Sequence, residues 1–259
     1  MATTTAFEYA PAPEARDTAR LRASYGIFLN GAFRDGAGGA VPTIDPSTGT
    51  ALAEVREAGV SDVDEAVAAA RTAYDGVWGR MPGRERAKYL FRIARAIQER
   101  GRELAVLESL DNGKPIRESR DVDVPLAAAH FFYYAGWADK LEHAGYGPSP
   151  RPIGVAGQII PWNFPLLMAA WKLAPALATG NTVVLKPAET TPLTALTLAE
   201  IIAECDLPPG VVNVLPGGPE IGRALVGHPG IDKIAFTGST EVGKEIQRTL
   251  AGTPTRLSL

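Results

Sequence analysis

With 259 residues, 46% of them hydrophobic, and a net charge of −3, the chain is long enough to bury a substantial core and has the composition of an ordinary globular protein. A sequence pI near 5.7 and the lack of a basic run argue against nucleic-acid or anionic-membrane partners and favour small metabolites. The single cysteine, Cys205, excludes an internal disulfide and any multi-cysteine zinc or iron–sulfur site, and no metal site is predicted.

The first part of the chain reads as a tail followed by edge strands. Residues 1–24 mix Pro and Ala with acidic residues and lack the apolar segment of an export signal, so we expect a flexible tail. Nothing in the chain is long and apolar enough to span a membrane, and a cytoplasmic location is expected by default. Between Tyr25 and Val60, short apolar runs broken by turns such as Asn30-Gly31 predict hairpins.

Three long helices are predicted next, which makes residues 25–144 a helical and edge-strand part. The first has Ser61 as its N-cap and ends near Gly79. The second follows Pro82 as one helix and stops at Asn112-Gly113. The third runs from about residue 116 to 141, and we interpret its aromatic face and its histidine, His130, as core packing.

A proline-rich connection at residues 145–152 precedes a repeating pattern at residues 153–259. Short Val/Ile-rich strands are predicted at 155–160, 182–185, 211–215 and 233–236. Helices are predicted at 166–178, at 193–205, after Pro219, and at 240–250. This alternation predicts an α/β fold with a doubly wound, Rossmann-like parallel sheet. Residues 255–259 read as the first half of a further strand.

The stretch GQIIPWNFP, residues 157–165, is a strand, a polar corner and the start of a helix. It presents the amide side chain of Asn163 between two prolines. Because ligands gather at the carboxyl ends of parallel strands, this corner predicts a fixed hydrogen-bond donor beside a ligand.

The stretch GSTEVGK, residues 238–244, follows a strand and opens a helix, so its backbone N–H groups could hold a phosphate. It is nearly a P-loop, but Glu245 stands where that motif needs Ser or Thr for magnesium. A P-loop-like NTPase is therefore a minor alternative, and a tight turn into a helix is another. The G-x-G-x-x-G dinucleotide fingerprint after a first strand is absent.

Lys186 and Glu189 come just past a predicted strand. A carboxylate there can accept hydrogen bonds from a ribose diol, and the lysine can donate one; the alternative is an exposed ion pair without a function. Cys205 has no cationic neighbour in the sequence to lower its pKa, so we interpret it as a buried core thiol.

The segments GQIIPWNFPLLMAAWK, ALATGNTVVLKPAETTPLTA, PPGVVNVLPG and KIAFTGSTEVGK, in this order and spacing, resemble the NAD(P)-dependent aldehyde dehydrogenase superfamily. The resemblance covers the chain from Tyr25 onward. It implies that a cysteine thiolate attacks an aldehyde, that hydride passes to the nicotinamide, and that a glutamate activates water to release the acid.

The resemblance also implies roles for individual residues. Asn163 corresponds to the side-chain donor of the oxyanion hole, and Lys172 matches a lysine of a proposed proton relay. Lys186 and Glu189 correspond to adenine-ribose contacts, and Glu189 favours NAD over NADP because a 2′-phosphate would face a carboxylate. The further cofactor-binding residues implied are Ile159, Pro161, Trp162, Gly218, Gly222, Phe236, Gly238, Ser239 and Val242, and the apolar aldehyde tunnel corresponds to Phe164, Leu167 and Trp171.

Two departures from the family pattern shape the prediction. The chain stops one residue before the position of the family's catalytic glutamate, and Cys205 does not match the nucleophile position. The stretch 141–152 is shorter than the family's strand pair, which helps to build the oligomer, so subunit number stays open.

We therefore expect an amino-terminal, cofactor-binding part of an NAD-dependent aldehyde dehydrogenase without the catalytic domain. It could be truncated, one half of a split enzyme, or a catalytically inactive nucleotide-binding or interaction subunit. The expected partners are a small aldehyde and either further copies in a full-length homo-oligomer or a complementary carboxy-terminal half.

Overall fold

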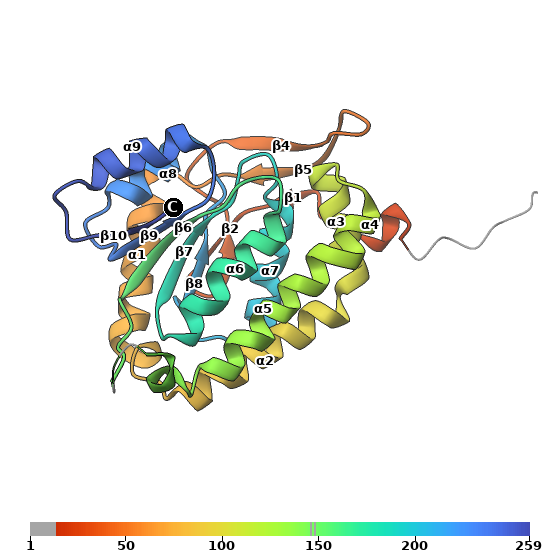
Figure 1. The fold of residues 1–259 in the computed structure, drawn as a ribbon. Coiled ribbons are helices and arrows are strands. Elements are labelled where there is room, and N and C mark those ends of the chain that lie inside the picture. The colour runs from red at the N-terminus through yellow and green to blue at the C-terminus, as the bar shows by residue number, and fades with distance from the viewer. Residues whose placement is uncertain (1–13, 146, 148) are drawn as a thin grey trace, which may run out of the picture.

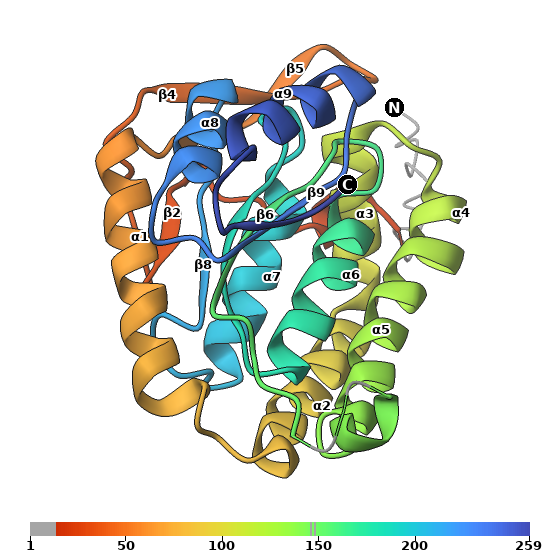
Figure 2. The same ribbon diagram turned by 60° about the vertical axis from the view of Figure 1, so that its left-hand side comes forward.

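The computed structural model describes residues 14–145, 147 and 149–259. Within these residues, seven strands form one sheet in the order β10-β9-β6-β7-β8-β2-β3, and three form a smaller sheet in the order β1-β5-β4. Helices cover both faces of the large sheet, with α1, α8 and α9 on one side and α2, α5, α6 and α7 on the other (Figures 1 and 2). The predicted doubly wound α/β fold is confirmed.

The elements have the following bounds. The strands are β1 Ser24–Tyr25, β2 Ile27–Leu29, β3 Ala32–Arg34, β4 Ala40–Asp45, β5 Thr50–Arg56, β6 Val155–Ile159, β7 Thr182–Lys186, β8 Val212–Val214, β9 Lys233–Phe236 and β10 Arg256–Ser258. The α-helices are α1 Val60–Ala73, α2 Gly83–Glu99, α3 Gly101–Asn112, α4 Ile116–Glu118, α5 Val124–Trp137, α6 Pro165–Ala178, α7 Leu193–Glu204, α8 Pro219–Gly227 and α9 Thr240–Leu250. Across the described residues, none of these helices combines the length and apolarity needed to cross a membrane.

The order of the parallel strands places the site. From β6 the chain moves outward to β7 and β8, then returns to the other side of β6 to form β9 and β10, all in parallel. The loops that leave β6 and β9 therefore go to opposite faces of the sheet. This divergence is the topological switch point at which open α/β sheets bind ligands. Strands β2 and β3 continue the sheet at the far edge in antiparallel orientation.

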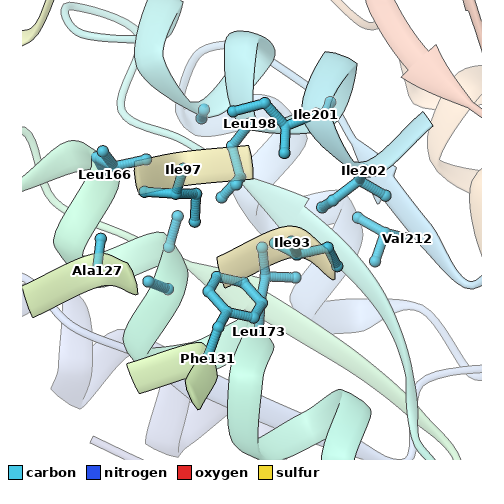
Figure 3. Packing of buried hydrophobic residues seen from close by; sticks show 14 of the residues in the cluster. Ile93, Ile97, Ala127, Phe131, Leu166, Leu173, Leu198, Ile201, Ile202 and Val212 are labelled. Carbon is cyan, nitrogen blue, oxygen red and sulfur yellow. The ribbon is translucent and has the colours of Figure 1, made fainter. Parts of the chain in front are cut away.

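The two faces of the sheet are packed by alternate residues of the same strand. In β7, Val183 and Leu185 belong to the core under α2, α5, α6 and α7, whereas Val184 belongs to the core under α1, α8 and α9. This is the two-residue period of a strand that is buried on both faces. Figure 3 shows the larger core, to which Ile93 of α2, Phe131 of α5, Leu173 of α6 and Ile202 of α7 all contribute side chains.

Several helix boundaries differ from the sequence predictions. The single helix predicted after Pro82 is two helices, because Arg100 leaves helical geometry (φ −93°, ψ 16°) and its guanidinium bonds Glu103 at 2.9 Å. Helix α1 begins at Val60 instead of after Ser61. Its first turn is held by Asp62, whose carboxylate accepts the N–H group of Gly59 at 2.8 Å.

The predicted third helix begins at residue 116 as expected but ends earlier than residue 141. It consists of α4, a π-helical turn at Ser119–Asp123 and α5, and a separate 3₁₀ turn covers Leu141–Ala144. Its aromatic face is core only in part, since Phe131 is fully buried while Tyr133 is 60% exposed.

Residues 14–24, the described part of the predicted tail, contact the rest of the fold. Arg16 pairs with Asp45 of β4, and Arg22 pairs with Glu200 of α7 at 2.6 Å. Ala19 is buried in the larger core. Residues 14–24 therefore differ from the flexible segment predicted, and residues 1–13 lie outside the described residues, as do 146 and 148 of the predicted connection.

Helix α3 caps the two helices that follow β6 and β7. The carboxylate of Glu108 accepts the N–H group of Leu166 in the first turn of α6, and that of Asp111 accepts the N–H group of Leu193 at the start of α7, at 3.4 and 2.9 Å. Asp111 also accepts the Thr43 hydroxyl at 2.7 Å. Burial raises the pKa of Glu108 and of Asp111 to about 7. These carboxylates fix where α6 and α7 begin.

Replacing Asp111 with alanine should destabilise the fold. The change removes the acceptor of the Leu193 N–H group and the partner of the Thr43 hydroxyl, so we expect the free energy of unfolding to fall by about 1–3 kcal/mol in urea denaturation. The exposed Asp75→Ala variant is the matched control and should stay within about 0.5 kcal/mol of the parent chain. Equal stability of the two variants would contradict the capping role.

The raised pKa of Asp111 predicts a pH dependence of stability. Because the folded-state pKa of about 7 lies above the unfolded value, the folded state binds more protons in between, and this group's contribution falls as pH rises through that window. The Asp111→Asn variant, which cannot ionise, should therefore lose less stability than the parent chain between about pH 5 and pH 8. If the free energy of unfolding of Asp111→Asn and of the parent chain changed equally with pH, the predicted role of Asp111 ionisation would be contradicted.

Candidate functional site at the strand switch point

A cleft of about 480 Å³ opens at the carboxyl ends of β6 and β9, where the strand order reverses. Strands β6 and β9, together with α9, can be followed in Figure 2. The cleft is lined by Ile159, Ile160, Pro161, Trp162, Asn163, Lys186, Ala188, Glu189, Phe236, Thr237, Gly238, Ser239 and Val242. The structure thus brings most of the predicted cofactor-binding residues together with Asn163 in one hollow, although they come from three separate strand ends.

The Asn163 corner joins β6 to α6. Pro161 and Pro165 bound it, and Pro165 occupies the first position of α6, where no N–H donor is needed. The carbonyl group of Trp162 accepts hydrogen bonds from the amide of Asn112 and from the Thr191 hydroxyl. Asn163 itself is exposed, and its side chain makes no hydrogen bond to any other described residue. The backbone of the corner is held while the amide of Asn163 stays available.

Lys186 ends β7 at the floor of the cleft. Its ammonium group donates to the Pro187 carbonyl at 3.0 Å and to Glu189 at 3.5 Å. The lysine is 5% exposed, and burial lowers its pKa while the Glu189 carboxylate opposes that shift. The Glu189 side chain is 46% exposed. The pair therefore offers a buried donor and an accessible carboxylate acceptor at the lip of the cleft.

Glu57, which the sequence analysis missed, adds a second carboxylate to this group. It follows β5 and is half-buried. Burial raises its pKa, the charge of Lys186 lowers it, and the charge of Glu189 raises it again, so the three charges lie close enough to interact. No local motif marks this residue, because its proximity to Lys186 arises from the way the two sheets pack.

A second chamber of about 320 Å³ continues from the cleft between α8 and α9. Its walls are mainly apolar, and they comprise Ile159, Lys186, Glu189, Pro219, Gly222, Arg223, Val226, Phe236, Val242, Glu245, Ile246 and Thr249. Of the predicted residues Gly218 and Gly222, Gly222 lines this chamber, whereas Gly218 lines neither it nor the cleft. Val242 is 42% exposed, so its apolar side chain is accessible from the chamber.

The turn after β9 forms the side of the cleft opposite the Asn163 corner. The Ser239 hydroxyl caps α9 by accepting the N–H group of Val242 at 3.3 Å. The ring of Phe236 lies against Gly238, where an added Cβ would come within 2.4 Å of it. The helix N-terminus and its free N–H groups can face an anion here. Glu245, the departure from the P-loop pattern, is paired with Arg223 at 2.8 Å.

Lys172 reaches the turn after β9 from the middle of α6. Its ammonium group donates to the hydroxyl of Thr237 at 2.9 Å. Burial and, to a smaller extent, the nearby charge of Lys233 together lower its pKa to about 8. Thr237, also missed in the sequence analysis, lines the cleft, so it connects Lys172 to that space.

The three predicted tunnel residues lie along one face of α6. Leu167 is 7% exposed, whereas Phe164 and Trp171 are 39% and 53% exposed. Trp171 stacks on His130 of α5 at a ring distance of 5.6 Å. These residues do not line the cleft with Asn163, and the exposed rings continue the aromatic face of α5.

Cys205 lies at the far end of α7 from the cleft. It is 7% exposed, and burial raises its pKa. The 12 residues of α7 give this helix a length of about 18 Å, and Cys205 follows its last residue. The interpretation of Cys205 as a core thiol is confirmed. In the part of the chain that the structure describes, no three His, Cys, Asp or Glu side chains are grouped to hold a metal ion.

Comparison with known proteins gives a consistent result. Residues 33–259 match the aldehyde dehydrogenase family. Human retinal dehydrogenase 2 is 51% identical over 233 residues, or 85% of this chain and 45% of that protein. The mitochondrial aldehyde dehydrogenase family 2 member B4 of Arabidopsis thaliana is 50% identical over 85% of this chain and 43% of its own length.

A solved NAD+ complex of an aldehyde dehydrogenase from Bacillus cereus superposes with a TM-score of 0.87 at 45% identity, covering 92% of this chain and 50% of that one. The chain thus spans about half the length of the relatives it matches.

The pKa of Lys172 can be measured directly. After reductive methylation with ¹³C-formaldehyde, its signal, assigned by its loss in Lys172→Arg, should titrate near pH 8, well below the signals of exposed lysines. Lys233→Gln should raise the midpoint, because it removes a neighbouring positive charge. A Lys172 midpoint at the usual lysine value of about 10.4 would contradict the burial argument.

Proposed function

Because the chain belongs to the aldehyde dehydrogenase family, we propose that it binds NAD and supplies the oxyanion donor in the NAD-dependent oxidation of an aldehyde to a carboxylic acid. The observation that carries this proposal is the cleft at the switch point, which combines a free amide at Asn163 with the Lys186–Glu189 pair. The cofactor assignment is supported by the likeness to the Bacillus cereus enzyme, whose structure contains NAD+.

The residues present fit a dinucleotide. The apolar chamber between α8 and α9 has the size and walls for an adenine ring against Val242. Glu189 and Lys186 would bond the adjacent ribose diol, and the turn at Gly238 and Ser239 would meet the pyrophosphate through backbone N–H groups. Bound NAD supplies a hydride acceptor. The remaining space, next to Phe236, Thr237 and the Asn163 corner, is where its nicotinamide would lie.

Asn163 acts on the aldehyde oxygen. As the carbonyl carbon becomes tetrahedral, negative charge develops on its oxygen, and a pre-positioned amide N–H stabilises that charge more than it stabilises the neutral carbonyl. Cys205 is too distant to be the attacking thiolate, so no residue of this chain is assigned as nucleophile.

Lys172 is placed to move protons at the edge of this space. Its pKa of about 8 leaves both protonation states populated near neutral pH, and its ammonium group already donates to Thr237 at the wall of the cleft. A lysine that exchanges a proton through the Thr237 hydroxyl is consistent with the relay role that the family resemblance implies.

The charges at the lip of the cleft favour NAD over NADP. A 2′-phosphate on the adenosine ribose would lie against the Glu189 carboxylate, with Glu57 as a second negative charge nearby. Lys186 could offset only part of this repulsion, because it is already engaged by Glu189 and the Pro187 carbonyl.

A nucleotide-binding subunit without catalysis is the second candidate, favoured by the place of Cys205 outside the cleft that Asn163 lines. It shares the NAD cleft but gives Asn163 no function. The NTPase alternative is weakened by the ion pair that engages Glu245, and magnesium-dependent ATP hydrolysis lost in Lys244→Ala would be needed to revive it. The cytoplasmic location and the homo-oligomer or complementary half stay predictions.

The preference for NAD over NADP tests the proposed role of Glu189 at the lip of the cleft. Glu189→Gln should weaken NAD binding by about 10- to 100-fold in isothermal titration calorimetry, because it removes a charged hydrogen-bond acceptor for the ribose. It should weaken NADP binding less, so that the preference for NAD narrows. Glu220→Gln, at an exposed position beside the chamber, is the matched control and should bind NAD as the parent chain does. Equal affinities of the two variants for NAD would contradict the assignment.

Replacement of Asn163 should affect turnover without affecting NAD binding. In the enzyme that carries this chain, Asn163→Ala should lower kcat for aldehyde oxidation by about 100- to 1,000-fold. NAD affinity should not change, since the amide contacts the aldehyde oxygen and not the dinucleotide. Absorbance of NADH under saturating NAD measures the first quantity, and calorimetry the second. Unchanged turnover in Asn163→Ala would favour the non-catalytic alternative.

A further inference from the structure

The free amide of Asn163 raises the question of what holds it in place. Its own side chain has no hydrogen-bond partner among the described residues, so its position depends on the backbone of the corner. Pre-organisation of a catalytic donor requires that its support be rigid, because a small displacement weakens the bond to the developing charge.

We propose that the carboxyl end of α3 and the turn after it position the Asn163 amide. The three residues concerned, Glu108, Asn112 and Lys114, are called the α3 anchor. They are positioning residues, since none of them reaches the cleft. The catalytic consequence rests on the proposed function of Asn163, whereas the mechanical role does not.

Asn112 holds the residue before Asn163. It is the last residue of α3, and its amide donates to the carbonyl group of Trp162. The Thr191 hydroxyl donates to the same carbonyl at 3.5 Å. Fixing this carbonyl fixes the plane of the peptide that joins Trp162 to Asn163, and therefore the direction in which the Asn163 side chain leaves the backbone.

Lys114 holds the residue after Asn163. Its ammonium group lies 4.1 Å from the centre of the Phe164 ring, and it is paired with the carboxylate of Asp123. The side chains of Lys114 and Asp123 are only 11% and 1% exposed, so the ring faces a cation that water screens little. Gly113 makes this placement possible. It ends α3 in the left-handed region (φ 84°), and a Cβ there would come within 2.6 Å of Pro46.

Glu108 holds the start of the helix that follows the corner. Its carboxylate accepts the N–H group of Leu166 at 3.4 Å, and Lys114 lies 4.0 Å from its other oxygen. It lies one turn before Asn112 on α3, so both side chains project to the same side of the helix. The contacts therefore fall on residues 162, 164 and 166 and flank Asn163 on both sides.

The anchor belongs to a part of the fold separate from the strand–helix units. Helix α3 precedes β6 in the chain and packs in the larger core through Leu104 and Leu107. A fixed helix end that contacts residues 162, 164 and 166 can set the conformation of the corner from outside the β6–α6 unit. This arrangement makes the orientation of Asn163 sensitive to substitutions that leave the cleft itself unchanged.

The test follows Trp162 by ¹⁹F NMR in the chain labelled with 5-fluorotryptophan. The sequence has four tryptophans, and the Trp162 signal is assigned by its loss in Trp162→Phe. Asn112→Asp replaces a donor by an isosteric acceptor, and Lys114→Met removes the cation while keeping a long apolar stem. Both should shift or broaden the Trp162 signal and leave that of the fully buried Trp78 unchanged, which shows that the core is intact.

Two further variants serve as controls. Lys114→Arg keeps a cation over the Phe164 ring and should restore most of the parent signal. Arg102→Ala, at an exposed position of the same helix, should leave the Trp162 signal as it is. A Trp162 signal that is unchanged in both Asn112→Asp and Lys114→Met would overturn the proposal. So would a change in which Lys114→Arg and Lys114→Met behave alike.

Kinetics separates this inference from the proposed function. In the enzyme that carries this chain, Asn112→Asp should lower kcat by about 10- to 100-fold through a displaced donor, with the KM for NAD changed by less than about threefold. If the parent chain does not bind NAD, the proposed function is wrong. The Trp162 signal would still decide whether the α3 anchor positions the Asn163 corner. A changed Trp162 signal with unchanged kcat would overturn the link between the anchor and Asn163.

Discussion

Right-handed crossovers place α6 and α7 on one face of the sheet and α8 and α9 on the other, because the chain moves outward from β6 to β8 and then returns to the other side of β6 to form β9 and β10. This reversal separates the loops that leave β6 and β9 and creates the hollow between them. Three groups line that hollow, and each follows the carboxyl end of a strand. They are the amide of Asn163 after β6, the Lys186–Glu189 pair at the end of β7, and the capped start of α9 after β9. The site exists because of the strand order, and its residues supply the chemistry.

Burial sets the charge state of the groups around the hollow. It lowers the pKa of Lys186 and Lys172, and it raises the pKa of Glu108 and Asp111 behind the corner. Lys172, with a pKa of about 8, can thus release its proton near neutral pH, whereas the carboxylates behind the site lose little by remaining neutral. Burial therefore suits Lys172 to proton transfer, and it suits Glu108 and Asp111 to holding the helix starts behind the site.

Local sequence signals predicted the strands and helices of residues 153–259 closely, because hydrophobic period and turn residues are local properties. They also pointed to Asn163, Lys186 and Glu189, since a polar residue just after an apolar strand is visible in sequence. They did not indicate Glu57 or Thr237, whose roles come from packing between distant elements. The break at Arg100 was missed for a similar reason, because Arg100 is held in part by Glu200, 100 residues later.

The caps supplied by α3 also order events in folding. Glu108 and Asp111 lie 58 and 82 residues before the N–H groups that they accept. During synthesis, both carboxylates leave the ribosome before their partners in α6 and α7. Closing these loops costs conformational entropy, so formation of the two caps is a step that follows the synthesis of α6 and α7. A chain arrested before that step would possess all its strand-forming sequence and yet have no ordered site.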